Sequence, residues 1–337
     1  MYRLPGHNTS LPAPPQRTIR INVEIMNCLV TGASGFIGSA LVKRLVQNGH
    51  RVRAVLHNTS TLQREAQVEY VIADLLDPAS LSPLFSDIDT VFHCAALVKD
   101  FGSKKEIMNV NLKGTQHLVQ ACSNKIHRFI FLSHLHSTSP KKIGAYSSSK
   151  ALAEHYLLQQ HQNNQFPVVI IRPGSVYGPG ATTWCVRPLQ AIQQNRIALI
   201  DHGSGIFLHT YLENLLDGLL SALTASPIEG EVIEITDGDN ATTWKTYLND
   251  LATLAGKPPI TRNITKTTAS LISHIMMMRY SLLHRTPLLT PTAVHLFTNH
   301  RTVSIEKAHK LLGYSPVVDY AEGMKRTAKW LKKEQYI

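Results

Sequence analysis

The chain has 337 residues, of which 43% are hydrophobic and 17% charged, and its formal net charge is +11 at pH 7. This composition indicates a globular protein with one large or two modest domains. Its four cysteines are scattered without a CxxC pair, which argues against a disulfide framework and a metal site and favours a reducing, cytoplasmic location. No apolar run approaches the length of a membrane span.

The first 25 residues differ in composition from the rest of the chain. Residues 1–20 contain several prolines and arginines, no acidic residue and no apolar core of a signal peptide. We expect residues 1–25 to form a disordered tail; a targeting segment and an upstream-start artefact are the alternatives. Residues 26–175 are then expected to form a dinucleotide-binding domain, and residues 176–337 a substrate-binding lobe.

A glycine-rich turn follows the first expected strand, residues 28–30. Three glycines at three-residue spacing precede an expected helix at 37–46 and a second strand at 52–56. Such a unit provides a tight turn, a close backbone approach to a pyrophosphate and a helix N-terminus facing the phosphates. A purely structural turn is the alternative. The predicted cofactor-binding residues here are Gly32, Ser34, Gly35, Phe36, Ile37 and Gly38.

Strands and helices continue to alternate up to Arg172. Further apolar strand candidates are residues 70–72, 90–93, 129–132 and 168–171. This alternation predicts an α/β fold with a doubly wound, parallel sheet of the Rossmann type. The pattern then loosens: a late strand at 232–235 is expected to return to the core sheet, and the rest predicts a smaller, mostly helical C-terminal lobe.

Tyr146 and Lys150 lie four residues apart on an expected helix, 145–159, and therefore on one face of it. A cationic lysine near a phenol favours the phenolate and would lower the pKa of the tyrosine. The tyrosine could then exchange a proton with a carbonyl or alcohol oxygen, and the lysine could also hold the nicotinamide ribose. This pattern is common by chance, but its position behind a dinucleotide turn favours a catalytic pair.

With these motifs the chain resembles the extended short-chain dehydrogenase/reductase family, also called the NAD-dependent epimerase/dehydratase type, from about residue 26 to 330. The segments 73–75, 93–96, 111–115 and 172–179 are similar to family motifs in the expected order. The resemblance implies a homodimer and an asparagine, Asn111, that supports the catalytic helix and proton relay. It also implies further cofactor-binding residues: Asp74, Leu75, Ala95, Ala96, Pro173 and Ser175, with Tyr146 and Lys150.

The chain departs from the family pattern at the third catalytic position. The family has a serine or threonine just after the strand at 129–132, often in a Ser-Ser pair. Here the sequence reads Ser133-His134-Leu135-His136-Ser137. We predict that Ser133 fills the role; His134 and Ser137 are the alternatives.

The choice of cofactor depends on the end of the second strand. NAD-binding proteins usually place an acid there to hold the ribose 2′-hydroxyl, but His57 and Asn58 follow the strand here. His57, Asn58, Thr59 or Ser60 could bind a 2′-phosphate, so the sequence favours NADP and leaves NAD open.

Residues 251–305 contain no Asp or Glu but several basic residues. Within this stretch, residues 271–283 are apolar and rich in methionine, a side chain that adapts to irregular surfaces. We interpret the region as a lid for an apolar substrate that has an anionic group, or as a membrane-surface contact through residues 268–289. A packed helix with a solvated basic flank is the alternative. The layout resembles the 3β-hydroxysteroid dehydrogenase-like branch and long-chain 3-oxo acid reductases.

Three functions are therefore considered. The first is an NAD(P)-dependent oxidoreductase that interconverts a secondary alcohol and a ketone on a steroid-like or long-chain substrate. The second is a nucleotide-sugar epimerase or dehydratase that retains NAD, and the third is a non-catalytic dinucleotide sensor. Nucleic acid is not an expected partner, because the basic residues form no stripe interleaved with aromatic residues.

Overall fold

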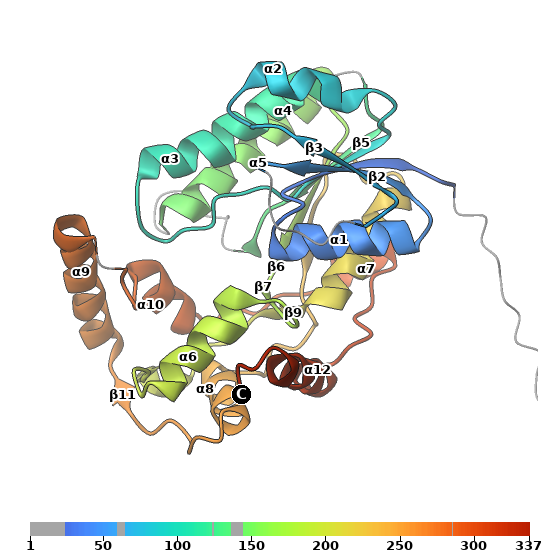
Figure 1. Cartoon of the computed structure of the whole chain (residues 1–337). Coiled ribbons are helices and arrows are strands. Elements are labelled where there is room, and N and C mark those ends of the chain that lie inside the picture. The colour runs from blue at the N-terminus through green and yellow to red at the C-terminus, as the bar shows by residue number, and fades with distance from the viewer. Residues whose placement is uncertain (1–23, 59–64, 123–124, 136–143, 285) are drawn as a thin grey trace, which may run out of the picture.

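A seven-stranded sheet, parallel throughout, forms the centre of the molecule (Figure 1). The computed structural model describes residues 24–58, 65–122, 125–135, 144–284 and 286–337. The strand order is β10-β6-β5-β4-β1-β2-β3. The strands are β1 (Asn27–Thr31), β2 (Arg51–Leu56), β3 (Val68–Ile72), β4 (Thr90–His93), β5 (Arg128–Leu132), β6 (Val168–Pro173) and β10 (Val232–Ile235). The doubly wound α/β fold expected from the sequence is confirmed.

Helices cover both faces of this sheet, and the strand residues alternate between them. Cys28 and Val30 of β1 belong to the core on one face, whereas Leu29 belongs to the core on the other. The first face is covered by α1 (Phe36–Gln47), α7 (Leu212–Thr224) and α11 (Glu306–Leu312). The second face is covered by α2 (Pro78–Leu81), α4 (Gly114–Cys122) and α5 (Ala145–Asn164). Burial on both faces explains why the strands read as continuous apolar runs rather than as alternating patterns.

The order of the strands reverses between β1 and β4. The chain leaves β1 towards β2 on one side and reaches β4 on the other, so a crevice opens beyond the carboxyl ends of this pair. Thr31 and His93 end these two strands in register, and Thr31 Oγ1 lies 2.7 Å from His93 Nδ1. Ligands of open parallel sheets bind at this point of the fold.

The C-terminal lobe lies beyond this carboxyl edge and has its own aromatic core (Figure 1). Phe207, Trp244 and Tyr247 are buried at its centre, and the Phe207 and Tyr247 rings stack with centroids 4.0 Å apart. Two short strand pairs join it: β7 (Ser175–Tyr177) with β9 (His209–Tyr211), and β8 (Leu199–Ile200) with β11 (Asn263–Ile264). Its longer helices are α6 (Arg187–Gln193), α8 (Trp244–Leu254), α9 (Lys266–Leu283), α10 (Pro291–Phe297) and α12 (Tyr320–Lys333).

Segments from the second half of the chain also complete the nucleotide-binding layer. β10 pairs in parallel with β6 and forms one edge of the sheet. Arg172 of β6 binds Glu154 of α5 through two hydrogen bonds, and Arg301 binds Glu234 of β10 at 2.6 Å. No helix within the described ranges combines the length and hydropathy that a membrane crossing requires.

Candidate active site

The glycine-rich turn forms a cradle that excludes side chains. Gly32 has φ +69°, and a Cβ atom there would lie 2.7 Å from the backbone N and Cα of Ala95. A Cβ atom on Gly38 would overlap the carbonyl oxygen of Gly32. The Gly35 amide donates to the same oxygen over 2.9 Å, which closes the turn. Only glycine permits this approach of the turn to α1 and to the loop after β4.

The N-terminus of α1 opens at this turn. Its N-cap, Gly35, makes no side-chain capping bond, and the first turn of the helix contains no acid. Free amides and the positive end of the helix dipole therefore face the crevice. This cradle and these donors fit the pyrophosphate of a dinucleotide.

A cleft of about 310 Å³ joins the turn to the segments that carry the predicted catalytic residues. It brings together most of the predicted site residues, namely Gly32, Gly35, Phe36, Ile37, Gly38, Ala96, Ser133, Tyr146, Lys150, Pro173 and Ser175. Ser34 is exposed on the turn itself, and Ala95 supports Gly32 from behind. Residues more than a hundred positions apart in the sequence thus share one cavity.

Tyr146 lies at the first turn of α5, at the wall of the cleft. Desolvation raises the pKa of its hydroxyl, and the carboxylate of Asp100 raises it further. This direction is opposite to the one predicted from the sequence, because burial and Asp100 both raise the pKa and Lys150 is not among the groups that shift it. The phenol is therefore protonated at neutral pH.

Lys150 is fully enclosed, with 2% of its surface exposed. Its Nζ lies 4.2 Å from the centroid of the Phe131 ring, an arrangement that favours the cation. Burial nevertheless lowers the pKa of the ammonium group to about 8, while Cys94 and Glu154 act in the opposite direction. Keeping Lys150 charged in this largely apolar part of the cleft therefore costs free energy of folding.

Ser133 and His134 both line the cleft directly after β5. Ser133 Oγ is buried and has no hydrogen-bond partner among the described residues. The His134 ring stacks on Tyr146, with centroids 5.0 Å apart and planes 29° apart. Ser133 thus offers an unpaired hydroxyl in the cleft that also contains the predicted catalytic pair, whereas the third candidate, Ser137, lies outside the described residues.

Asn111 lies behind the cleft and connects two of its walls. Its side chain accepts from the Leu97 amide at 2.7 Å and donates to the Leu97 carbonyl at 3.2 Å. The same amide nitrogen donates to Ser149 Oγ, which in turn donates to the carbonyl of Tyr146. Asn111 therefore positions α5 relative to the loop after β4, in keeping with its predicted supporting role.

The residues predicted to bind the adenosine end lie outside the cleft lining. His57 is exposed after β2, and its Nδ1 lies 4.0 Å from Asp74 Oδ1. Leu75 packs closely on Gly114, and its carbonyl lies 2.9 Å from His117 Nδ1. Thr59 and Ser60, the other phosphate-binding candidates, lie outside the described residues.

Several wall residues were missed by sequence reasoning. They come from the loop after β4, the segment after β7 and α10 of the C-terminal lobe, and they are Val98, Thr182, Thr183, Trp184 and Leu296. Thr182 and Thr183 follow the Gly-Pro-Gly turn at 178–180, a signal that could have identified them. Leu296 has no such signal, because its position depends on the packing of distant segments.

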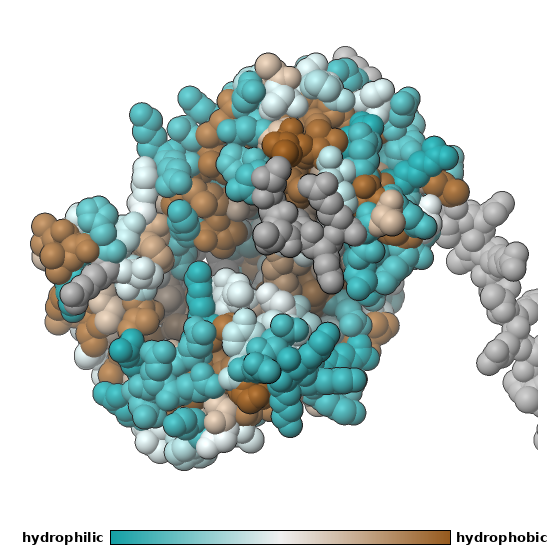
Figure 2. Space-filling view, in the orientation of Figure 1, coloured by the Kyte–Doolittle hydropathy of each residue, from teal (hydrophilic) through white to brown (hydrophobic). Residues whose placement is uncertain are grey.

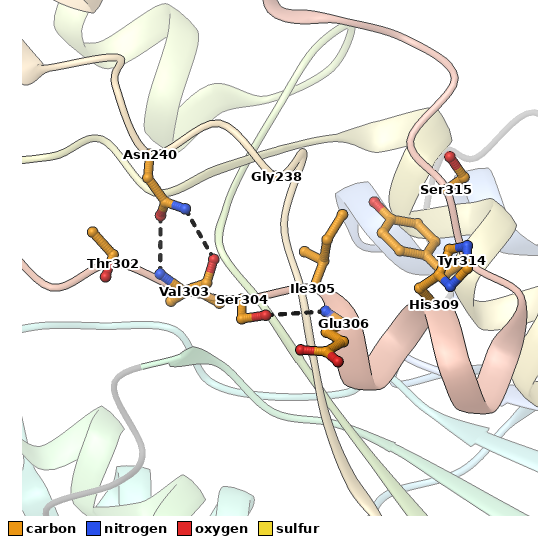
Figure 3. A pocket seen from close by; sticks show the side chains of 10 residues that line it. All are labelled: Gly238, Asn240, Thr302, Val303, Ser304, Ile305, Glu306, His309, Tyr314 and Ser315. Carbon is orange, nitrogen blue, oxygen red and sulfur yellow. Dashed lines mark hydrogen bonds between the residues drawn. The ribbon is translucent and has the colours of Figure 1, made fainter.

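A second, more open hollow of about 550 Å³ lies beside α11 (Figure 3). Its polar groups bind one another: the Asn240 amide pairs with both backbone groups of Val303, and Ser304 Oγ accepts from the Glu306 amide. Gly238, Tyr314 and Ser315 line this hollow and not the cleft. None of the predicted catalytic residues reaches it, so the smaller cleft is the candidate active site.

Comparison with known proteins agrees with this geometry. A 3beta-hydroxysteroid-dehydrogenase/decarboxylase from Arabidopsis thaliana is 28% identical over 89% of this chain and 78% of its own. A 2-alkyl-3-oxoalkanoate reductase from Stenotrophomonas maltophilia is also 28% identical, over 89% of this chain and 98% of its own. Among solved structures, a UDP-glucuronic acid 4-epimerase from Bacillus cereus in complex with UDP-glucuronic acid and NAD has a TM-score of 0.73. It is 25% identical and covers 92% of this chain and 100% of its own.

The family model for the NAD dependent epimerase/dehydratase family matches residues 28–236. This range contains the glycine cradle, the Tyr146–Lys150 pair and the strand end at Ser133. The chain therefore belongs to the NAD-dependent epimerase/dehydratase family and is an NAD(P)-dependent enzyme of the extended short-chain dehydrogenase/reductase type.

Proposed function

We propose that the protein is an oxidoreductase that interconverts a ketone and a secondary alcohol on an apolar substrate of steroid-like or long-chain 3-oxo type. One observation carries the proposal: the cleft that holds the catalytic pair is otherwise walled largely by apolar side chains. These include Phe36, Val98, Leu132, Val176, Trp184 and Leu296. The names of the similar plant and bacterial enzymes support the same substrate class.

The residues of the chain would handle the substrate oxygen. The Tyr146 hydroxyl would donate its proton to a ketone oxygen, because its raised pKa keeps it protonated at neutral pH. Ser133 Oγ would donate a hydrogen bond to the same oxygen, since its hydroxyl is buried and unpaired among the described residues. Lys150, which lines the same cleft, would hold the nicotinamide ribose. A bound nicotinamide cofactor supplies or accepts the hydride.

The raised pKa of Tyr146 also predicts different pH dependences for the two directions of the reaction. Oxidation of an alcohol requires a phenolate to accept the proton, and this state forms only as the pH rises towards the raised pKa. Reduction requires the phenol, which is present at neutral pH. We therefore propose that the rate of alcohol oxidation rises with pH, whereas ketone reduction already proceeds near pH 7.

We propose NADP as the preferred cofactor. No carboxylate follows β2, where His57 and Asn58 are both exposed. Arg53 of the same strand is not available for a phosphate, because it binds Glu69 and the carbonyls of Leu84 and Ser86. Recognition of a 2′-phosphate would thus depend on His57, Asn58 and the segment after them.

The test is a fluorescence titration of the purified protein with NADPH and NADH, followed by addition of a panel of 3-ketosteroids and long-chain 3-oxo acids. We expect tighter binding of NADPH and consumption of one equivalent of it per apolar ketone reduced. Equal affinity for both nucleotides would contradict the cofactor proposal. Absence of turnover on every ketone would contradict the substrate proposal.

A nucleotide-sugar epimerase that retains NAD is the second candidate, favoured by the structural similarity to the UDP-glucuronic acid 4-epimerase. In that case the protein would purify with bound NAD and would interconvert UDP-sugars without net redox change. Incubation with UDP-glucuronic acid and UDP-glucose, followed by chromatography of the products, distinguishes the two functions.

A further inference from the structure

The outward face of α9 carries a line of exposed aliphatic side chains. Leu271, Ile275, Met278 and Leu282, called here the outer stripe, are 64%, 47%, 63% and 73% exposed. Their spacing of four, three and four residues places them along one face of the helix. At about 100° per residue, this face is opposite to the buried Ala269, through which α9 packs against Ile200 and Val294. The helix is therefore apolar on both sides, but only the inner side is covered by described residues.

The outer stripe is part of a larger apolar surface. Leu283 and Leu288 follow the stripe in the sequence and are 59% and 65% exposed. Figure 2 shows this brown surface over α9 at the left edge of the molecule. Single exposed aliphatic residues are ordinary, but six within eighteen positions indicate an interaction surface.

The charged side chains on α9 itself are basic, although the carboxylate of Asp201 accepts from the Lys266 amide at the start of the helix. Lys266, His274 and Arg279 are exposed on α9, and His284 is exposed directly after it. The sequence contains no Asp or Glu between residues 251 and 305. Such a surface repels a second copy of itself and attracts an anionic one. An apolar helix face with basic residues beside it is typical of a helix that lies in the headgroup region of a bilayer.

We propose that the outer stripe of α9 docks on an anionic lipid bilayer, with its aliphatic side chains inserted among the headgroups. This contact would also orient the cleft. Tyr280 of α9 meets Phe101 edge to face at 5.1 Å, and Phe101 belongs to the loop that supplies Val98 to the cleft. α10, which packs on α9, supplies Leu296 to the same cleft.

The docked protein would thus hold the mouth of its cleft next to the lipid, where an apolar substrate is concentrated. This second step rests on the proposed function, whereas lipid binding itself does not.

The test uses the full chain and sucrose-loaded vesicles of phosphatidylcholine, with and without phosphatidylglycerol, in a co-sedimentation assay. We expect binding to the anionic vesicles that weakens with salt. The variant Leu271→Gln/Met278→Gln/Leu282→Gln should lower the partition coefficient by about 100-fold. Lys266→Glu/Arg279→Glu should lower it by about tenfold or more, on anionic vesicles only.

The matched control is Ile25→Gln/Val317→Gln, which replaces two equally exposed aliphatic residues away from α9. It should bind like the wild type. No binding of the wild type, or equal binding of the triple variant, would overturn the proposal. A concentration-dependent dimer that the triple variant abolishes would assign the stripe to a second copy instead, and would overturn it as well.

Activity on a water-soluble ketone separates this proposal from the proposed function. The triple variant should keep the wild-type kcat/KM on that substrate and lose only the rate gained when an apolar ketone is presented in anionic vesicles. Vesicle binding without turnover of any ketone would contradict the proposed function and leave lipid docking supported.

Discussion

The two ends of the cleft are built in different ways. At the turn end, backbone atoms fix the geometry: Gly32 lies against the backbone of Ala95, and Asn111 binds the backbone of Leu97. At the lobe end, side chains from distant segments make the wall, among them Trp184 and Leu296. We infer that substitutions at the turn end change the kinetics on every substrate. Substitutions at the lobe end should change the kinetics on only some substrates.

The largest expected effect comes from Tyr146→Phe. Loss of the proton donor should lower kcat about 1,000-fold on every substrate, because general acid catalysis contributes roughly 10²–10⁴. The measurement is the steady-state rate of ketone reduction at saturating cofactor. Tyr156→Phe, on the same helix but outside the cleft, is the control and should leave the rate unchanged. A Tyr146→Phe enzyme with near wild-type kcat would exclude this residue as the acid.

Gly32→Ala should weaken cofactor binding by about 100-fold, as measured by nicotinamide fluorescence. Both Gly32 and Gly49 have positive φ, but a Cβ atom at Gly49 meets nothing within 4 Å, whereas one at Gly32 meets the backbone of Ala95. Gly49→Ala therefore carries only the backbone strain of about 1 kcal/mol. Equal losses of affinity in both variants would show that strain, rather than the cradle, is responsible.

Ser133→Ala should lower kcat about 100-fold, the usual effect of removing one donor from a developing oxyanion. His134→Ser leaves this hydroxyl in place and should cost less than tenfold. The two rates, measured on one ketone, decide which residue polarises the substrate oxygen. A larger loss in His134→Ser would assign that role to His134.

Lys150→Met should change stability in a pH-dependent manner. Burial lowers the pKa of the Lys150 ammonium from its usual 10.5 to about 8. Between these two values the unfolded state binds more protons than the folded state, so the contribution of Lys150 to stability rises with pH. Below pH 8 the buried charge costs about 3 kcal/mol.

The free energy of unfolding of the variant should therefore exceed that of the wild type. The difference should be largest at pH 7 and should become smaller towards pH 10. Urea denaturation at several pH values measures this gap. Lys43→Met, at an exposed lysine on α1, is the control. A gap that stays constant with pH would contradict the assigned pKa.

The smallest effect should come from Leu296→Ala at the lobe end. Removing this wall residue should raise KM about tenfold for a bulky apolar ketone, since a few buried methylenes contribute one to two kcal/mol. A small ketone should show little change. Leu289→Ala, which packs beside α10 but does not line the cleft, is the control. A uniform rise in KM for all ketones would remove the distinction between the two ends.

The sequence was sufficient for the parts of the molecule that local pattern determines. Each expected strand of the central sheet is present, because buried parallel strands are short apolar runs bounded by turns. The direction of the Tyr146 pKa shift was wrong, since it depends on burial and on Asp100, and neither follows from residue spacing. The places of Leu296 and Arg301 could not be predicted for the same reason: tertiary packing alone brings Leu296 to the cleft and Arg301 to Glu234.

Because β10 pairs with β6, the first half of the chain cannot complete the central sheet on its own. A chain cut after residue 175 would leave β6 as a bare edge, because its partner strand comes from residues 232–235. It would also leave Arg172 without Glu234, and the sheet without the cover of α7. To transfer the substrate specificity of one relative to another, two separate lobe segments would thus have to be exchanged. One segment precedes residue 209 and the other follows residue 236, so replacement of the C-terminal part alone would not suffice.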